Sequence, residues 1–186
     1  MEPPTTTEDA HRIDLLAVGE LLVDLISERP VAHLAEAERF RRVQGGSPAN
    51  LAGNVARLGH RAALVACVGD DGPGRFATEQ VAERGVMTEH VATTPEAPTT
   101  LVLVARAAGT PDFVAYRGAD RRIAPAQLDA ALIARSRIYH TTCFALSREP
   151  ARGSILEGAR RAAEAGCTLS LDANYAPPIG PARTEA

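Results

Sequence analysis

Residues 45 to 50 of the chain, Gly-Gly-Ser-Pro-Ala-Asn, combine groups that can bind a small molecule. Gly45 and Gly46 carry no Cβ, so a ligand can approach the backbone N–H groups there and at the start of the helix that follows. Asn50 adds a side-chain amide in the first helical turn. Several fixed donors and one amide suit a polyhydroxylated small molecule. The alternative is a tight strand-to-helix turn in which Asn50 only caps the helix.

A carboxylate interrupts the apolar run Leu-Leu-Val-Asp-Leu-Ile at residues 21 to 26. Burying a carboxylate alone is costly, so Asp24 must be paired or must lie at a strand end facing a ligand. In an open α/β sheet, ligands bind beyond the carboxyl ends of the strands. We therefore expect Asp24 and Asn50 to converge on one cleft there, where Asp24 can accept hydrogen bonds from two sugar hydroxyls.

The elements that must position these residues alternate along the chain. Short apolar runs predict strands, and the segments between them predict helices that end at glycines. Continuous apolar strands separated by helices indicate an α/β fold, in which a parallel sheet is covered on both faces. The predicted strands are 15 to 18, continued by 21 to 26, then 62 to 68, 138 to 142 and 167 to 171, and the helices begin near 47, 72 and 150.

The helix after the two glycines has its own start and stop signals. Ser47 is the expected N-cap and Pro48 the first helical residue, because the missing N–H of proline would have been unpaired there anyway. Leu51, Val55 and Leu58 fall on one face, which we expect to be the buried one, with Asn50 off this stripe.

Residues 99 to 123 do not follow the alternation of strands and helices. They contain two β-type runs joined by Gly-Thr-Pro-Asp, which predicts an antiparallel hairpin of 99 to 105 with 112 to 116. A hairpin between βα units usually stands outside the main sheet as a flap or lid. An edge hairpin without a functional role is the alternative.

Composition and charge limit the class of protein. The net charge of −3 gives no polybasic surface for nucleic acid or anionic lipid. Cys67, Cys143 and Cys167 lie in apolar runs without CxxC spacing and with no signal peptide, which favours buried reduced thiols and a cytoplasmic protein. No apolar stretch approaches the ~20 residues of a membrane span. Residues 1 to 12 are expected to be a polar tail.

Several motifs occur in the order and spacing of one family. The chain from 13 to 186 resembles the N-terminal part of the ribokinase-like, PfkB-type carbohydrate kinases. The resemblance implies a three-layer ribokinase-like sheet with helices on both faces, plus a small β lid at about 99 to 123 that is often also a dimer contact. The Gly-Glu-x-x-x-Asp form at 19 to 24 is more similar to fructokinases and 2-keto-3-deoxygluconate kinases than to ribokinase. The motifs are GELLVDLI at 19 to 26, GGSPANLAGNVARLG at 45 to 59, VGDDGPGRF at 68 to 76, YRGAD at 116 to 120 and LDANYAPP at 171 to 178.

The family also implies roles for particular residues. Asp24, Gly45, Gly46 and Asn50 would contact the sugar, and Arg117 would reach it from the lid, where it could pair with the carboxylate of a sugar acid. Asp172 and Asn174 match a D-x-N element whose asparagine approaches the nucleotide phosphates. The family uses ATP and Mg²⁺ to phosphorylate a sugar hydroxyl.

Two departures from the family pattern bear on activity. Ala176 stands where many members have arginine, which weakens the sugar-acid interpretation. Family members also run to roughly 300 residues, and the later part holds the N-x-x-E metal element, the G-A-G-D anion hole with its catalytic aspartate, and the adenine pocket. We therefore expect a C-terminally truncated fold without the catalytic base, which would contribute roughly 10²- to 10⁴-fold to the rate, and without most of the ATP and Mg²⁺ site.

Three functional hypotheses follow. The chain is the N-terminal part of a sugar kinase, or a non-catalytic module for sugar binding or dimerisation, or an unrelated nucleotide-binding or oxidoreductase domain. The third is disfavoured because neither a phosphate loop nor a G-x-G-x-x-G fingerprint occurs.

Overall fold

The structure, a computed structural model, describes residues 12 to 107 and 112 to 174. Nearly all of the predicted polar tail, the hairpin turn at 109 to 111 and Ala176 lie outside the described residues.

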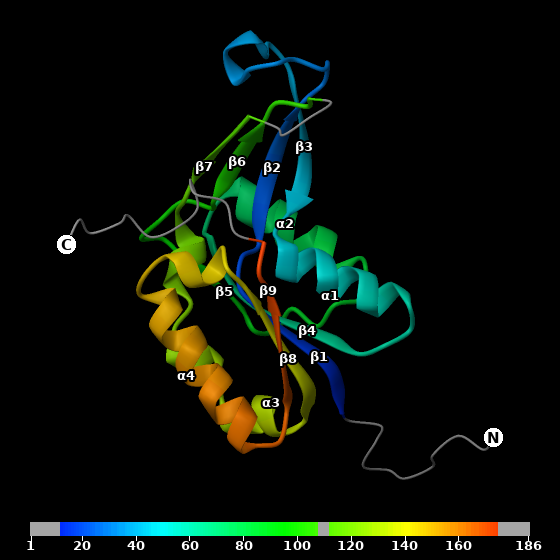
Figure 1. Cartoon of the computed structure of the whole chain (residues 1–186), viewed down its shortest axis with the longest axis vertical. Helices are drawn as coiled ribbons and strands as arrows, with labels where there is room; N and C mark the ends of the chain where they lie inside the picture. Colours follow the sequence, from blue (N-terminus) through cyan, green and yellow to red (C-terminus); the bar gives the residue numbers. More distant parts are fainter. Residues whose placement is uncertain (1–11, 108–111, 175–186) are drawn as a thin grey trace.

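A five-stranded parallel sheet forms the centre of the fold, in the order β5-β4-β1-β8-β9 (Figure 1). Strand β4 has the sequence AALVACVG and is buried along its whole length, as a strand covered on both faces should be. Strand β8, on the other side of the chain's first strand, has the more polar sequence SRIYHTT and is buried mainly in its second half. The sequence correctly predicted a parallel sheet and four of these five strands, whereas the edge strand β5 was not predicted. Their bounds are β1 Ile13–Val18, β4 Ala62–Gly69, β5 Val91–Thr94, β8 Ser136–Thr142 and β9 Thr168–Asp172.

Helices lie on both faces of this sheet and complete three layers. One apolar core joins β1 and β4 to α1 and α2 and includes Leu15, Leu64 and Val81. The other, on the opposite face, joins the sheet to α3 and α4 and is built around Tyr139 and Ile155. The Tyr139 hydroxyl donates to the Ile155 carbonyl at 2.9 Å, which satisfies this buried phenol. The helices are α1 Ser47–Arg57, α2 Gly72–Ala82, α3 Ala130–Ala134 and α4 Ala151–Glu164.

A second sheet stands off the first, in the order β3-β2-β6-β7, and we call it the lid (Figure 1). The predicted antiparallel hairpin is confirmed, since β6 pairs with β7 from Leu101↔Tyr116 to Val104↔Phe113. The lid is larger than that hairpin, because β2 pairs parallel with β6 and antiparallel with β3. Its strands are β2 Leu22–Ser27, β3 Phe40–Gly45, β6 Leu101–Val104 and β7 Phe113–Tyr116.

The interpretation of β2 as a continuation of the first strand was therefore wrong. The chain leaves the main sheet at Val18 and enters the lid at Leu22. A backbone N–H of Gly19 still bonds the Val65 carbonyl at 3.0 Å, so the change of sheet takes place across Gly19, Glu20 and Leu21. As a result, Asp24 lies within a lid strand and not at the end of a main-sheet strand.

Helix α1 begins and packs differently from the prediction. Gly46, with φ of 104°, is the N-cap, and Ser47 is the first helical residue. The buried face carries small residues, Pro48, Ala49, Ala52 and Gly53, while Leu58 is 78% exposed. Small residues let α1 approach the sheet closely, which hydrophobicity alone did not indicate.

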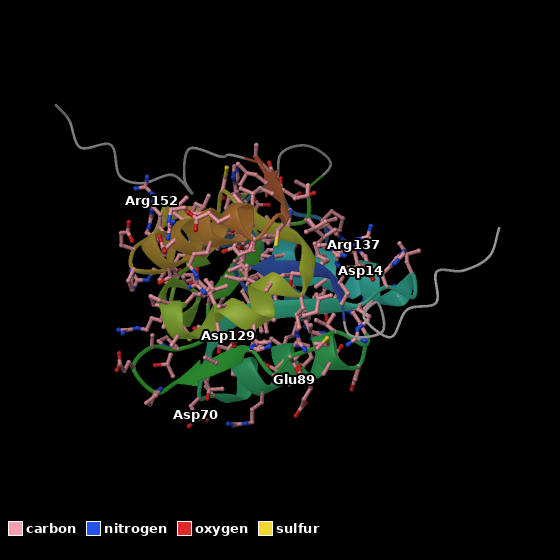
Figure 2. The ribbon with its side chains drawn as sticks, turned by 90° about the horizontal axis from the view of Figure 1, so that it is seen from below. Asp14, Asp70, Glu89, Asp129, Arg137 and Arg152 are labelled. Atoms are coloured by element: carbon pink, nitrogen blue, oxygen red, sulfur yellow. The ribbon has the colours of Figure 1, made fainter. Side chains whose placement is uncertain are left out.

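Strand β9 lies at one edge of the sheet, and no strand among the described residues pairs with its outer side (Figure 1). Leu169 and Leu171 are 50% and 54% exposed on one of its faces. On the other face a groove of about 660 Å³ has Leu51, Val55 and Ile138 among its lining residues. Arg137 and Asp14 also line this groove, and the Arg137 Nη1 atom lies 3.5 Å from Asp14 Oδ1 (Figure 2). Within the described residues, no helix is long and apolar enough to cross a bilayer.

Candidate functional site

A pocket of about 190 Å³ lies where the lid meets the main sheet. Its walls come from the segment between β1 and β2, from lid strands β2 and β6, from the start of α1, and from the carboxyl ends of β8 and β9. The ends of two parallel strands thus open into it, as ligand sites in α/β proteins do. The lining residues are Glu20, Leu22, Asp24, Gly46, Ser47, Val102, Thr142, Phe144, Asp172 and Asn174.

Asp24 projects from the lid into this pocket beside Val102, its direct neighbour on β6. The side chain is half-buried, and the described part of the chain offers its carboxylate no hydrogen-bond or salt-bridge partner. Desolvation raises the pKa of Asp24 from 3.8 to about 6. A partly desolvated carboxylate without a partner can accept hydrogen bonds from ligand hydroxyls.

The two glycines make room for the side chain of Asp24 on β2 and for the main chain of Glu20, which lies just before β2. A Cβ at Gly45 would collide with the carboxylate of Asp24, and a Cβ at Gly46 would collide with the main-chain carbonyl of Glu20. The positive φ of Gly46 is a further reason for glycine there. Gly46 lines the pocket directly, whereas Gly45 acts on it through Asp24.

The D-x-N element and α1 meet at the pocket. The Ser47 hydroxyl donates to Asp172 Oδ2 at 2.9 Å, and the Asn174 N–H donates to Asp172 Oδ1 at 3.0 Å. Both carboxylate oxygens of Asp172 therefore have a protein donor, which ties the end of β9 to the start of α1 and to Asn174.

Glu20 is a pocket residue that the sequence analysis did not single out. Its carboxyl group accepts the Ser47 N–H at 3.1 Å and the Thr142 hydroxyl at 2.8 Å. Burial raises the pKa of Glu20 from 4.5 to about 7, mainly by desolvation. An acidic residue directly after an apolar strand and a glycine was the available signal.

Asn50 and Arg117 lie outside the residues that line this pocket. Asn50 is exposed in the first turn of α1. The Arg117 guanidinium donates from Nε to Asp120 at 2.6 Å and from Nη1 to Ser147 at 2.8 Å, and it stacks on the ring of Phe144. A sugar contact from either residue stays a prediction, and Arg117 would have to exchange existing partners to make one.

Cysteines and possible metal ligands are the other groups that could do chemistry among the described residues. Cys67 and Cys167 are buried and Cys143 is half-buried, all three as free thiols. No group of three or more His, Cys, Asp or Glu side chains between residues 12 and 174, as far as described, is placed to hold a metal ion.

Comparison with known proteins identifies the lineage. The family model described as pfkB family carbohydrate kinase matches residues 12 to 186. Fructokinase-1 of Oryza sativa subsp. japonica is 38% identical over 175 residues, which cover 92% of this chain and 54% of the rice protein. The chain therefore spans about half the length of the curated relatives it matches.

Solved structures give the same result for the fold. A fructokinase of Halothermothrix orenii superposes with a TM-score of 0.86 at 32% identity, covering 92% of this chain and 61% of that one. An uncharacterized sugar kinase of Pyrococcus horikoshii in complex with ATP superposes with a TM-score of 0.84 at 25% identity, over 89% of this chain and 54% of that one. The expected ribokinase-like fold is thus confirmed, in a form shorter than those chains.

Proposed function

Because the chain belongs to the pfkB family of carbohydrate kinases, we propose that it supplies the sugar-binding pocket and lid of an enzyme that phosphorylates a fructose-like sugar with ATP. We choose fructose as the proposed substrate because several of the relatives are fructokinases. Within the protein as a whole, Asp24 would bind sugar hydroxyls, and the carboxyl ends of β8 and β9 would close the opposite side of the pocket.

The single observation that carries this proposal is the environment of Asp24. Its carboxylate faces a pocket lined by Gly46 and Ser47, lacks a partner among the described residues, and has a pKa raised by desolvation. An unpaired carboxylate is costly unless a ligand completes its hydrogen bonds. Neighbouring hydroxyls of a sugar are donors of the right kind, and Val102 beside Asp24 offers an apolar surface to the ligand's C–H groups.

The described residues fit ATP and Mg²⁺ less well than they fit a sugar. Asp172 already accepts two hydrogen bonds from the protein, and the described residues provide no cluster of metal ligands. We propose that Asn174 approaches the phosphates of ATP. By the family resemblance, the base that takes the hydroxyl proton and the groups that hold Mg²⁺ belong to the later part of the longer family members, which this sequence does not span.

The chain's own residues bind and orient the sugar in this proposal. Asp24 holds hydroxyl groups of the sugar from the lid side. Gly46 and Ser47 present the start of α1, whose N-terminal dipole favours electron-rich oxygen atoms. The lid excludes water from a bound sugar, because β2 and β6 form one wall of the pocket.

Calorimetric titration of residues 1 to 186 with fructose, ribose and 2-keto-3-deoxygluconate tests the proposal. We expect saturable binding of fructose that is stronger than binding of the other two. The same samples with ATP and Mg²⁺ are assayed for sugar-dependent ADP release, where we expect no turnover above background. Binding without turnover supports a sugar-binding part of a kinase, and the absence of binding to all three sugars rejects the proposed site.

We also propose that the lid forms a homodimer contact. Val114 and Tyr116 are 42% and 62% exposed. They alternate with Ala115, which pairs with the pocket residue Val102, so they lie on the face of β7 away from the pocket. Sedimentation of wild type and Tyr116→Ser tests this contact, since the substitution should lower the dimer fraction. Equal dimer fractions would exclude it.

A further inference from the structure

Glu20 stands at the point where the chain passes from the main sheet into the lid. It is only 3% exposed, yet it lines the pocket with Asp24 and Asp172. Such a buried acid needs hydrogen-bond donors, and Glu20 has two. The Ser47 N–H reaches Oε1 at 3.1 Å, and the Thr142 hydroxyl reaches Oε2 at 2.8 Å.

These two donors belong to different elements of the fold. Ser47 is the first residue of α1, and Thr142 is the last residue of β8. The network continues on both sides, because the Ser47 hydroxyl donates to Asp172 and the Thr142 hydroxyl accepts the Ala145 N–H at 3.1 Å. One side chain thus connects the lid entrance, a helix start and the ends of two sheet strands.

The main chain of Glu20 also packs against the turn that begins α1. Its carbonyl group occupies the space that a side chain at Gly46 would need. Gly46 has φ of 104°, so the turn into α1 depends on the absence of a side chain there. Glu20 therefore contacts the turn at Gly46 and Ser47 with both its carbonyl and its carboxylate.

The charges around Glu20 are acidic. Asp120 of the short helix Ala119–Arg122 acts on it electrostatically, and Asp24 from β2 and Asp172 from β9 line the same pocket. The residues of α1 and β8 that contact it, Ser47 and Thr142, are uncharged donors. Desolvation by burial, with a smaller contribution from Asp120, outweighs the hydrogen bonds from Ser47 and Thr142 and raises the pKa of Glu20 to about 7, so its proton occupancy changes near neutral pH.

We propose that Glu20 is a positioning residue of the sugar pocket, which holds the Gly46–Ser47 turn against the end of β8 so that the turn and Asp24 face one ligand. The inference rests on the proposed function, since the ligand is the sugar proposed above. It assigns no contact between Glu20 and the sugar, because both carboxyl oxygens are engaged by the protein.

Glu20→Gln tests this role, with the exposed Glu89→Gln as matched control (Figure 2). In nuclear magnetic resonance spectra of the labelled chain, the Ser47 amide signal should titrate with a midpoint near 7 in wild type and in Glu89→Gln. Glu20→Gln should abolish this step. It should also weaken fructose binding by about tenfold, the effect of losing one hydrogen bond to a charged group.

A second pair of variants decides the question if Glu20→Gln does not fold. Thr142→Ser keeps the hydroxyl donor and should retain fructose binding, whereas Thr142→Val should lose about as much affinity as Glu20→Gln. Unchanged affinity in Glu20→Gln or Thr142→Val, with wild type binding fructose, overturns the positioning role. A wild type that binds no fructose while its Ser47 amide still titrates overturns the proposed function, and this inference falls with it.

Discussion

Replacement of Asp24 by asparagine should weaken sugar binding and stabilise the free protein at the same time. Asp24 is a half-buried carboxylate without a partner among the described residues, in a pocket beside Val102. Asparagine has nearly the same shape but carries no charge to desolvate. The two effects have opposite signs only if Asp24 is retained for a ligand and not for the fold.

The size of the stabilisation follows from the pKa of Asp24. Its rise from 3.8 to about 6 corresponds to at most about 3 kcal/mol at neutral pH. Because part of the side chain meets water, we expect Asp24→Asn to raise the free energy of unfolding by about 1 kcal/mol. Urea unfolding at pH 8 measures this, with Asp70→Asn as control, since Asp70 is an exposed residue that pairs with Arg75 on the surface (Figure 2).

The sign of the pH dependence is fixed by the direction of this shift. Folded Asp24 keeps its proton to higher pH than unfolded Asp24, so folding loses stability as pH rises from about 4 to 6. The penalty is complete above pH 6 and absent below the unfolded pKa. The advantage of Asp24→Asn should therefore be present at pH 8 and disappear near pH 4.

The binding effect should be larger. A hydrogen bond from a sugar hydroxyl to a carboxylate contributes about 1.5 to 3 kcal/mol, so Asp24→Asn should weaken fructose binding by about 10- to 150-fold. Wild-type affinity should also fall below pH 6, as Asp24 is protonated, and the variant should lack this step. A variant that is less stable than wild type at pH 8, or that binds fructose equally well, would refute the reasoning.

Three further substitutions test the pocket, the anchor of Arg117 and the open edge. Gly45→Ala should displace Asp24 and weaken fructose binding by about tenfold. The control Gly72→Ala, whose Cβ would meet no atom within 4 Å, should bind fructose like wild type. Equal calorimetric affinities of Gly45→Ala and wild type would contradict this. Asp120→Asn should lower the free energy of unfolding by about 3 kcal/mol in urea titrations, because it breaks a buried pair with Arg117; a loss below about 1 kcal/mol would match only a surface pair. Leu171→Lys should reduce self-association in sedimentation, since Leu171 is 54% exposed on the edge strand; an unchanged distribution would show that this edge does not associate.

Most of the main sheet could be predicted from the sequence, because β4 and residues Leu15 to Val18 of β1 are continuous apolar runs and the segments of β8 and β9 flank a clear helical pattern. The short edge strand β5, with the sequence VATT, has no such signal and was not predicted. The lid could be predicted only in part. Its hairpin has a clear turn signal, but β2 follows Val18 after three residues, and apolar periodicity alone does not distinguish one bent strand from two strands in different sheets. The residue type and its apolar neighbours singled out Asp24, which lines the pocket, whereas the place of Glu20 in the pocket depends on donors from Ser47 and Thr142, which are distant in sequence.

The buried face of α1 could not be predicted from apolar periodicity either. Leu51, Val55 and Leu58 form the stronger apolar stripe, yet Ala49 and Ala52 face the sheet. Close packing requires small side chains at that position, and this steric demand comes from β1 and β4, which the helix sequence does not encode. Leu51 and Val55 instead line the groove beside β9.

The most direct test of the sugar pocket is to map fructose onto the labelled chain by nuclear magnetic resonance. We predict that saturating fructose shifts the amide signals of Gly46, Ser47 and Val102, which surround Asp24. Shifts that instead gather at Ile138 and Ser170, in the groove beside β9, or the absence of any saturable shift, would contradict the assignment of this pocket to the sugar.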